Sequence, residues 1–250
     1  MNNSDIRHRF PGVRDGWSRF DGPAGTQIVD VAIRSMSDWA SNGSNANNGG
    51  SFTAAHDCDA LMGRTRNVIA QLFNAEATGV CLGANMTTMT MAFTRAVAKM
   101  LKPGDRVVGT RLDHDANVSP WRIACEMSGA EHVLAPFNAE TGALESSAVI
   151  DLIDDRTAWV AVTGASNLLG TAPHLAPIIR AAHDAGARVF VDAVHLAVHQ
   201  PIDIAALGCD VLACSPYKWY GPHAGVLCIE PNLLNDLPVA KVRPANNIGP

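Results

Sequence analysis

The stretch that decides the fold covers residues 187–225 and reads ARVFVDAVHLAVHQPIDIAALGCDVLACSPYKWYGPHAG. Residues 188–192 form a short apolar run that ends in a carboxylate, as expected of a buried strand with Asp192 at its C-terminal end. Residues 210–214 form a second apolar run, which leads into Ser215, Tyr217 and Lys218. Ligands of open parallel sheets collect outside the carboxyl ends of the strands. Both polar clusters are therefore predicted to lie at the ligand-binding edge of one sheet.

An aspartate and a lysine at such an edge suit the chemistry of pyridoxal 5'-phosphate (PLP). A lysine amine forms a Schiff base with the aldehyde of this cofactor, while an aspartate keeps a proton on the pyridine nitrogen so that the ring accepts electrons. The chain between Asp192 and Lys218 is long enough for one crossover between two strands. The alternative is a strand that happens to end in Asp and a surface lysine in a loop. The two residues together, in this order, favour the cofactor.

The same stretch resembles class V of the fold-type I PLP enzymes, the group of the cysteine desulfurases and isopenicillin epimerase. In that group a strand ending in Asp-x-x-Gln/His is followed by Ser-x-x-Lys-x-x-Gly-Pro. Here the two motifs read Asp192-Ala-Val-His195 and Ser215-Pro-Tyr-Lys218-Trp-Tyr-Gly221-Pro222. The resemblance implies PLP as the cofactor, Lys218 as the Schiff-base lysine and Asp192 as the partner of the ring nitrogen. It also implies a small amino acid as the substrate.

Strand and helix patterns alternate along most of the chain. Apolar runs predict strands at 79–82, 106–109, 132–135, 157–163, 189–192, 210–214 and 226–229. Helical spacing of apolar residues predicts helices at 26–40, 59–74, 87–101, 117–127, 145–153 and 175–185. This alternation predicts an α/β fold, a mostly parallel sheet with helices on both faces. The resemblance implies the same architecture, the large domain of fold-type I PLP-dependent transferases.

Residues 82–88, LGANMTT, join a predicted strand to a predicted helix. Small and hydroxyl residues at a helix start allow backbone N–H groups to meet an anion, and the helix dipole adds to the attraction. In the family this turn holds the cofactor phosphate, and the matching positions are Asn85, Met86 and Thr87. The alternative for this turn is an ordinary helix N-cap.

Two further turns resemble cofactor-contacting segments of the family. Residues 112–121, LDHDANVSPW, are similar to Glu-His-His-Ala-Asn-x-x-Pro-Trp, whose first histidine stacks on the cofactor ring, and His114 takes that place. Residues 163–171, TGASNLLGT, are similar to Ser-Asn-x-x-Gly-Thr, and Asn167 matches the residue that contacts the ring hydroxyl. His195 takes the Gln/His place that contacts the same oxygen. The resemblance thus makes Lys218, His114 and Asp192 the catalytic residues.

The motif around the lysine departs from the desulfurases at one position. Tyr217 stands where they usually have His, although its hydroxyl remains suited to the phosphate, to which Ser215 would also donate. Lys218 must lose its proton to attack a carbonyl, and burial in a cofactor pocket lowers the pKa of a lysine. The freed amine is the natural base for the α-proton of the substrate.

Composition limits the classes of partner and compartment. Apolar residues make up 47% of the 250 positions and charged residues 17%, with a net charge of −5, which argues against nucleic acid or an anionic membrane as the main partner. The sequence contains no export leader and no run of about 18 apolar residues, so neither export nor a membrane span is predicted. Six cysteines without a CxxC pair indicate a reducing compartment, the cytoplasm. Nine histidines show no metal-ligand spacing, and no metal site is predicted.

The expected organisation is an N-terminal arm over 1–22, a PLP-binding large domain over 23–235 and, over 236–250, the start of a linker to a missing C-terminal small domain. In complete relatives that small domain carries the arginine for the substrate carboxylate and the cysteine that receives sulfur. The leading hypothesis is desulfuration of L-cysteine to alanine and persulfide sulfur. An epimerase or aminotransferase-like enzyme, and a PLP-binding fragment without catalysis, remain alternatives. The resemblance implies a homodimer, and the arm with Trp17 and Phe20 suits packing on a second copy.

Overall fold

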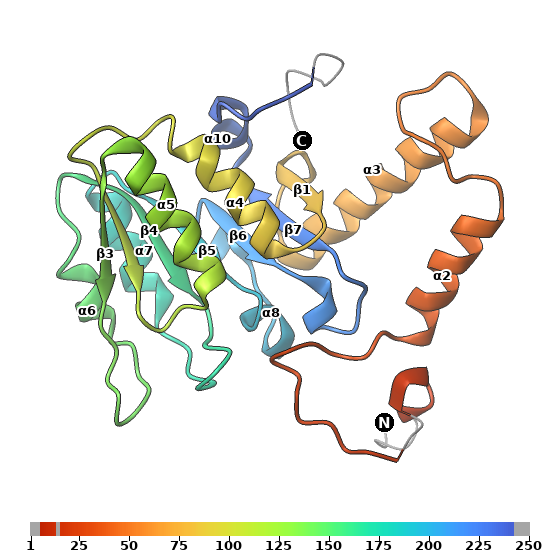
Figure 1. Ribbon diagram of the computed structural model, residues 1–250, viewed down its shortest axis with the longest axis horizontal. Helices are drawn as coiled ribbons and strands as arrows, with labels where there is room; N and C mark the ends of the chain where they lie inside the picture. The colour runs from red at the N-terminus through yellow and green to blue at the C-terminus, as the bar shows by residue number, and fades with distance from the viewer. Residues whose placement is uncertain (1–5, 14–15, 243–250) are drawn as a thin grey trace.

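The computed structural model of the protein describes residues 6–13 and 16–242, which form a seven-stranded sheet with helices on both faces (Figure 1). The strand order is β1-β7-β6-β5-β4-β2-β3. β7 runs antiparallel to its neighbours β1 and β6, and the pairs from β6 to β3 are parallel. The strands are β1 Val80–Gly83, β2 Arg106–Thr110, β3 Glu131–Ala135, β4 Thr157–Thr163, β5 Arg188–Asp192, β6 Val211–Cys214 and β7 Gly225–Ile229. The prediction of a mostly parallel sheet is confirmed.

The predicted helices are present in the predicted order, and α8 and α9, both between β5 and β6, were not predicted. They are α2 Asp30–Ser41, α3 Thr53–Phe73, α4 Met86–Val97, α5 Ser119–Ser128, α6 Ser146–Ile150, α7 Leu175–Asp184, α8 Leu196–His199, α9 Ile204–Leu207 and α10 Pro231–Asp236. Short 3-10 turns are η1 Pro11–Val13, η2 Ala77–Gly79, η3 Asp115–Asn117 and η4 Pro216–Lys218. None of the helices in the described part of the chain combines the length and apolar character that crossing a membrane requires.

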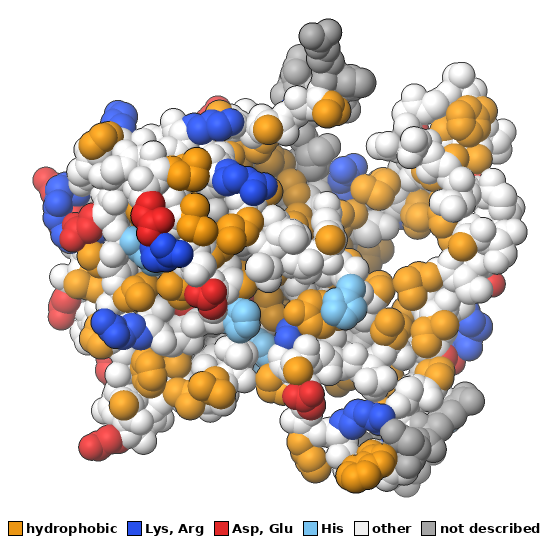
Figure 2. Space-filling view, viewed as in Figure 1, with side chains coloured by type: hydrophobic (Ala, Val, Ile, Leu, Met, Phe, Trp, Pro, Cys, Tyr) orange, Lys and Arg blue, Asp and Glu red, His pale blue; other side chains and the backbone are white. Residues whose placement is uncertain are grey.

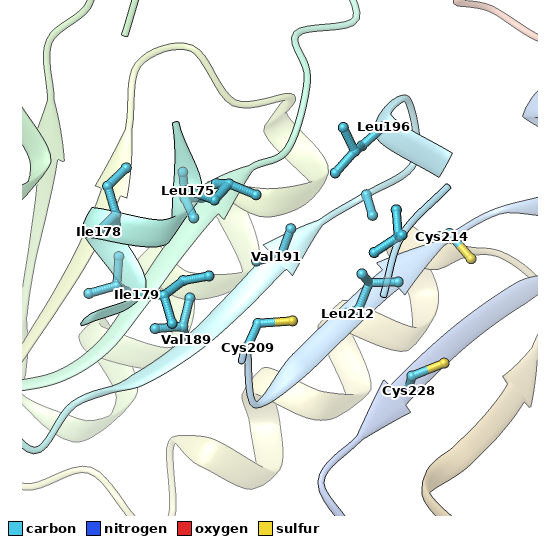
Figure 3. Packing of buried hydrophobic residues seen from close by; sticks show 14 of the residues in the cluster. Leu175, Ile178, Ile179, Val189, Val191, Leu196, Cys209, Leu212, Cys214 and Cys228 are labelled. Carbon is cyan, nitrogen blue, oxygen red and sulfur yellow. The ribbon is translucent and has the colours of Figure 1, made fainter. Parts of the chain in front are cut away.

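Side chains of the central strands alternate between two hydrophobic clusters, one on each face of the sheet. On β5, Val189 and Val191 point toward α7, where they meet Ile178 and Ile179 (Figure 3). Phe190, between them in sequence, belongs to the opposite cluster, which α4 and α5 cover. Both faces of β5 are thus buried, which is why this strand reads as a continuous apolar run rather than as an alternating one. Its only carboxylate, on Asp192, is left at the end that opens to the ligand edge.

The first long helix begins later than predicted. Helical spacing predicted a helix over 26–40, but α2 starts at Asp30. Residues before it are extended because their amides bond to the loop around the lysine: Thr26 N donates to Tyr217 O (2.9 Å) and Val29 N to Tyr220 O (3.0 Å). This contact joins the N-terminal segment to a loop about 190 residues later in the chain.

The N-terminal part of the chain extends away from the sheet. In Figure 1, α2 and the first half of α3 lie to the right of the sheet and leave their outer faces uncovered. No residue of α2 is buried, and Trp17 and Phe20 of the predicted arm are 73% and 94% exposed. Residues 1–5 and 14–15 of that arm, and 243–250 of the predicted linker, lie outside the described residues.

Candidate active site

One cavity at the carboxyl edge of the sheet collects nearly all of the predicted site residues. It is lined by Met86, Thr87, His114, Ala116, Thr163, Ala165, Asn167, Asp192, Val194, His195, Ser215, Tyr217 and Lys218. These residues lie at or just after the C-terminal ends of β2, β4, β5 and β6, or at the start of α4. Figure 2 shows histidine side chains gathered near the middle of this face of the molecule. Of the residues predicted to contact a cofactor, Asn85 does not line the cavity.

Asp192 is the buried acid of the site, with a side chain that is 5% exposed. Its Oδ1 accepts a hydrogen bond from Val194 N at 2.9 Å, and its Oδ2 receives no bond from the described residues. Burial raises the pKa of the Asp192 carboxyl to about 6, against the opposing effects of Val194 N, His114 and Lys218. The site thus holds a carboxylate with room for one further proton donor.

Lys218 is the buried amine of the site and is 8% exposed. Burial lowers its pKa, while Asp192 and Asp21 act in the opposite direction. Nζ donates a short hydrogen bond to Pro23 O, and it lies 4.7 Å from the ring centroid of Tyr217. The amine and the Asp192 carboxyl are therefore held in one cavity without forming a direct ion pair.

The start of α4 forms one end of the cavity. Met86 N donates to Ser215 Oγ at 2.9 Å, so the turn before the lysine is bonded to the first residue of this helix. Asn85 is the N-cap: its Oδ1 accepts from Thr88 N at 2.8 Å. A Cβ on Gly225 would lie 2.4 Å from the carbonyl carbon of Asn85, so only glycine lets β7 approach this turn so closely. The Asn85 side chain is thus engaged in capping, the alternative reading of this motif.

Two histidines of the cavity differ in their surroundings. His114 Nδ1 accepts from Ala116 N at 3.0 Å, which leaves the ring hydrogen on Nε2. His195 is half-buried, and burial, followed by the charges of Lys218, His199 and His114, lowers its pKa to about 4. Neutral imidazole is therefore the form of His195 at pH 7.

A second carboxyl, on the half-buried Asp113, supports the turn that carries His114. Asp113 accepts from Asn117 Nδ2 at 2.7 Å and from Thr110 Oγ1, and Asn117 Oδ1 in turn accepts from Trp121 Nε1 at 3.1 Å. Burial raises the pKa of Asp113 to about 8. This network ties the loop after β2 to the core, which fixes the place of His114 at the cavity.

Some contributions to the site were not predicted from the sequence. Ala116, Thr163, Ala165 and Val194 line the cavity; they lie within the quoted motifs, but the resemblance gave them no cofactor contact. The carbonyl of Pro23 meets the lysine, although the sequence assigns Pro23 to the beginning of a domain far from residue 218. A local sequence pattern does not predict a contact between two residues so far apart in the chain.

Comparisons with known proteins identify the family of the chain. The profile of the family named Aminotransferase class-V matches residues 19–243. A cysteine desulfurase of Enterobacter sp. (strain 638) is 34% identical over 226 residues, covering 87% of this chain and 54% of that protein. The cysteine desulfurase CsdA of Escherichia coli superposes with a TM-score of 0.85 at 29% identity, covering 95% of this chain and 60% of CsdA.

A more distant structure, a C-DES mutant with glycine covalently linked to the PLP cofactor, has a TM-score of 0.82 at 21% identity, covering 94% of this chain and 62% of its own. It shares the fold. The chain spans little more than half the length of the curated desulfurase it matches. With a profile match over most of its length, the protein belongs to the class-V aminotransferase family of fold-type I, PLP-dependent proteins.

Proposed function

We propose that the chain is the cofactor-binding part of a PLP-dependent enzyme that acts on a small amino acid, with desulfuration of L-cysteine to alanine and persulfide sulfur as the reaction. The observation that supports this proposal most directly is that a buried amine, Lys218, and a buried carboxyl, Asp192, line one cavity at the ends of neighbouring strands. The family assignment and the similarity to cysteine desulfurases support the reaction class.

The carboxylate of the cavity is suited to the ring nitrogen of PLP. Asp192 has one oxygen bonded to Val194 N and one without a donor. A buried carboxylate with a free acceptor is stabilised by a donor that brings a positive charge, which a protonated pyridine nitrogen provides. Asp192 would hold that nitrogen and its proton.

The opposite end of the cavity fits a phosphate group. α4 points its N-terminus at the cavity, where the helix dipole and the first backbone N–H groups favour an anion. Ser215 Oγ accepts from Met86 N and has its own hydrogen left to donate. We propose that Met86, Thr87, Ser215 and Tyr217 contact the phosphate. Asn85 would contribute through its backbone and by capping α4 with its side chain.

When bound, PLP supplies an aldehyde that takes up an amine and a ring that withdraws electrons from the α-carbon of an amino acid. Lys218 would hold the cofactor covalently through Nζ, and its lowered pKa increases the fraction of nucleophilic neutral amine. When free, Nζ would be the base that takes a proton from the substrate α-carbon. His114 would cover one face of the cofactor ring, with the hydrogen of its own imidazole on Nε2. Asn167 and the neutral His195 would contact the hydroxyl of the cofactor ring.

Two other functions have an observation in their favour. Tyr217, in place of the usual histidine of desulfurases, favours an epimerase or aminotransferase-like reaction. PLP binding without catalysis is the third candidate, and the chain spans 54% of the matched desulfurase.

Incubation of the PLP-loaded chain with L-cysteine and a thiol reductant separates these functions. Desulfuration predicts equal amounts of sulfide and alanine, measured by a colorimetric sulfide assay and by amino-acid analysis. Exchange of the α-proton in D₂O without sulfide would instead establish the epimerase-like reaction. Cofactor binding with neither product, for any amino acid tried, would establish the non-catalytic fragment.

A second copy of the chain is the proposed macromolecular partner. The apolar side chains of Trp17 and Phe20 are exposed, and so are Val31 and Met36 on α2, at 43% and 45%. Exposed apolar area of this extent favours association. We also propose a cytoplasmic location, because the six cysteines are present as free thiols, the form that a reducing compartment maintains.

A further inference from the structure

His223 lies in the turn between η4 and β7, where its imidazole stacks on the ring of Tyr217. The ring centroids are 4.4 Å apart and the planes differ by 9°. Tyr217 is part of the cavity lining, whereas His223 is exposed and is not part of that lining. His223 therefore contacts the site through another side chain. No family motif in the sequence singled it out.

The backbone of the turn brings His223 back over Tyr217. Tyr220 adopts a left-handed conformation with φ of 71°, and a Cβ on Gly221 would lie 2.8 Å from Cβ of Pro216. The chain thus reverses sharply after η4, and glycine is required where it passes Pro216. The stacked position of the imidazole follows from this reversal.

Tyr217 is held firmly at its backbone and less firmly at its ring. Its carbonyl accepts from Thr26 N at 2.9 Å and from Thr26 Oγ1 at 3.0 Å. Around the ring, a Cβ built on Gly25 would lie 3.4 Å from Tyr217 Cδ2, which is ordinary contact distance, so Gly25 itself leaves space there. Lys218 Nζ lies 4.7 Å from the ring centroid. The imidazole of His223 is the ring stacked on Tyr217, and such a stack restricts the side-chain torsions that the tyrosine can adopt.

We propose that His223 is a positioning residue for the cofactor: its stacked ring fixes Tyr217 so that the tyrosine hydroxyl meets the phosphate beside Ser215. This inference rests on the proposed PLP site. A tyrosine without the stacked partner would occupy several rotamers, and the phosphate would have to select one of them at a cost in affinity. The role belongs to the flat ring and not to a charge or a proton of the imidazole.

The test measures the affinity of the 250-residue chain for PLP and for pyridoxal, which lacks the phosphate. His223→Ala is expected to weaken PLP binding about tenfold, the scale of one lost aromatic stack, and to change pyridoxal binding by less than about twofold. His223→Phe keeps a stacking ring and should bind PLP within about twofold of the wild type. His174→Ala, at an exposed histidine outside the cavity, is the matched control and should bind both ligands as the wild type does.

A double-mutant cycle shows whether His223 acts through Tyr217. Tyr217→Phe keeps the ring and loses the hydroxyl, and adding His223→Ala to it should cause no further loss of PLP affinity. Thermal unfolding without PLP establishes that each variant folds. If His223→Ala does not fold, His223→Leu replaces it as a variant with bulk but no stacking ring.

Three results would overturn the positioning role: equal weakening of PLP and pyridoxal, a His223→Phe variant as weak as His223→Ala, or additive effects in the cycle. A wild-type chain that binds no PLP would overturn both this role and the proposed function. A wild-type chain that binds PLP but converts no amino acid would contradict the proposed reaction alone, and the affinities of the variants would still decide the role of His223.

Discussion

The buried carboxyl of Asp192 couples the cofactor site to folding. Burial raises its pKa from 3.8 to about 6, so between these pH values the folded chain keeps a proton that the unfolded chain has lost. Stability therefore falls as the pH rises through this window, and the cost, about 3 kcal/mol for a difference of this size, is fully present above it. The proposed cofactor, with its protonated ring nitrogen, would offset this cost when bound.

Asp192→Asn tests this cost. The amide keeps the size of the side chain and its acceptor for Val194 N, but it has no charge to bury. We expect the variant to have a higher free energy of unfolding than the wild type at pH 7 and to approach the wild type near pH 4. Urea unfolding of the PLP-free chains at both pH values measures the difference. The same difference at both pH values would show that the carboxyl is not responsible.

The residues of the site were predictable where they end a strand. Asp192 and Ser215 each follow a buried apolar run, so their place at the ligand edge follows from the rule for parallel sheets. Pro23 and His223 were not, because their contacts with Lys218 and Tyr217 depend on the path of loops and not on any periodic pattern.

The turn into α4 offers a way to separate capping from cofactor binding. Asn85→Ala removes the acceptor for Thr88 N and is expected to cost about 1 kcal/mol of stability, as other N-cap replacements do. Asn85→Asp keeps the acceptor and adds a negative charge at the proposed phosphate site. It should therefore retain the stability of the wild type in the PLP-free state but weaken PLP binding.

Thermal unfolding and PLP titration of the two Asn85 variants make the comparison. A variant with Asp at this position that binds PLP as tightly as the wild type would place the phosphate away from the α4 N-terminus. Equal stability of the Ala variant and the wild type would show that the cap contributes little.

The order of strands and helices was also predictable, and the exceptions have a physical reason. β4 begins and ends at the predicted residues because both of its faces are buried and its apolar run is uninterrupted. The start of α2 was predicted too early, because residues 26–29 have helical spacing but their amides bond to the lysine loop. A local pattern describes which side chains are apolar, whereas this contact depends on backbone donors and a distant partner.

For the whole molecule, the exposed apolar groups of the N-terminal part predict a homodimer. Light scattering and sedimentation of the 26.4 kDa chain should give twice that mass. Replacement of Phe20 and Met36 by Asp places charges on this surface and should shift the equilibrium toward the monomer, while Asp at the exposed Met127 of α5 should not. A monodisperse monomer that still binds PLP tightly would contradict the dimer.

The central claim, that Lys218 is the cofactor lysine, is tested most directly by borohydride reduction of the PLP-loaded chain and peptide mass spectrometry. The account predicts one pyridoxyl group per chain, attached to Lys218, and none in Lys218→Ala, while the exposed control Lys102→Ala is labelled like the wild type. Stoichiometric labelling of another lysine, or full labelling of Lys218→Ala, would contradict it.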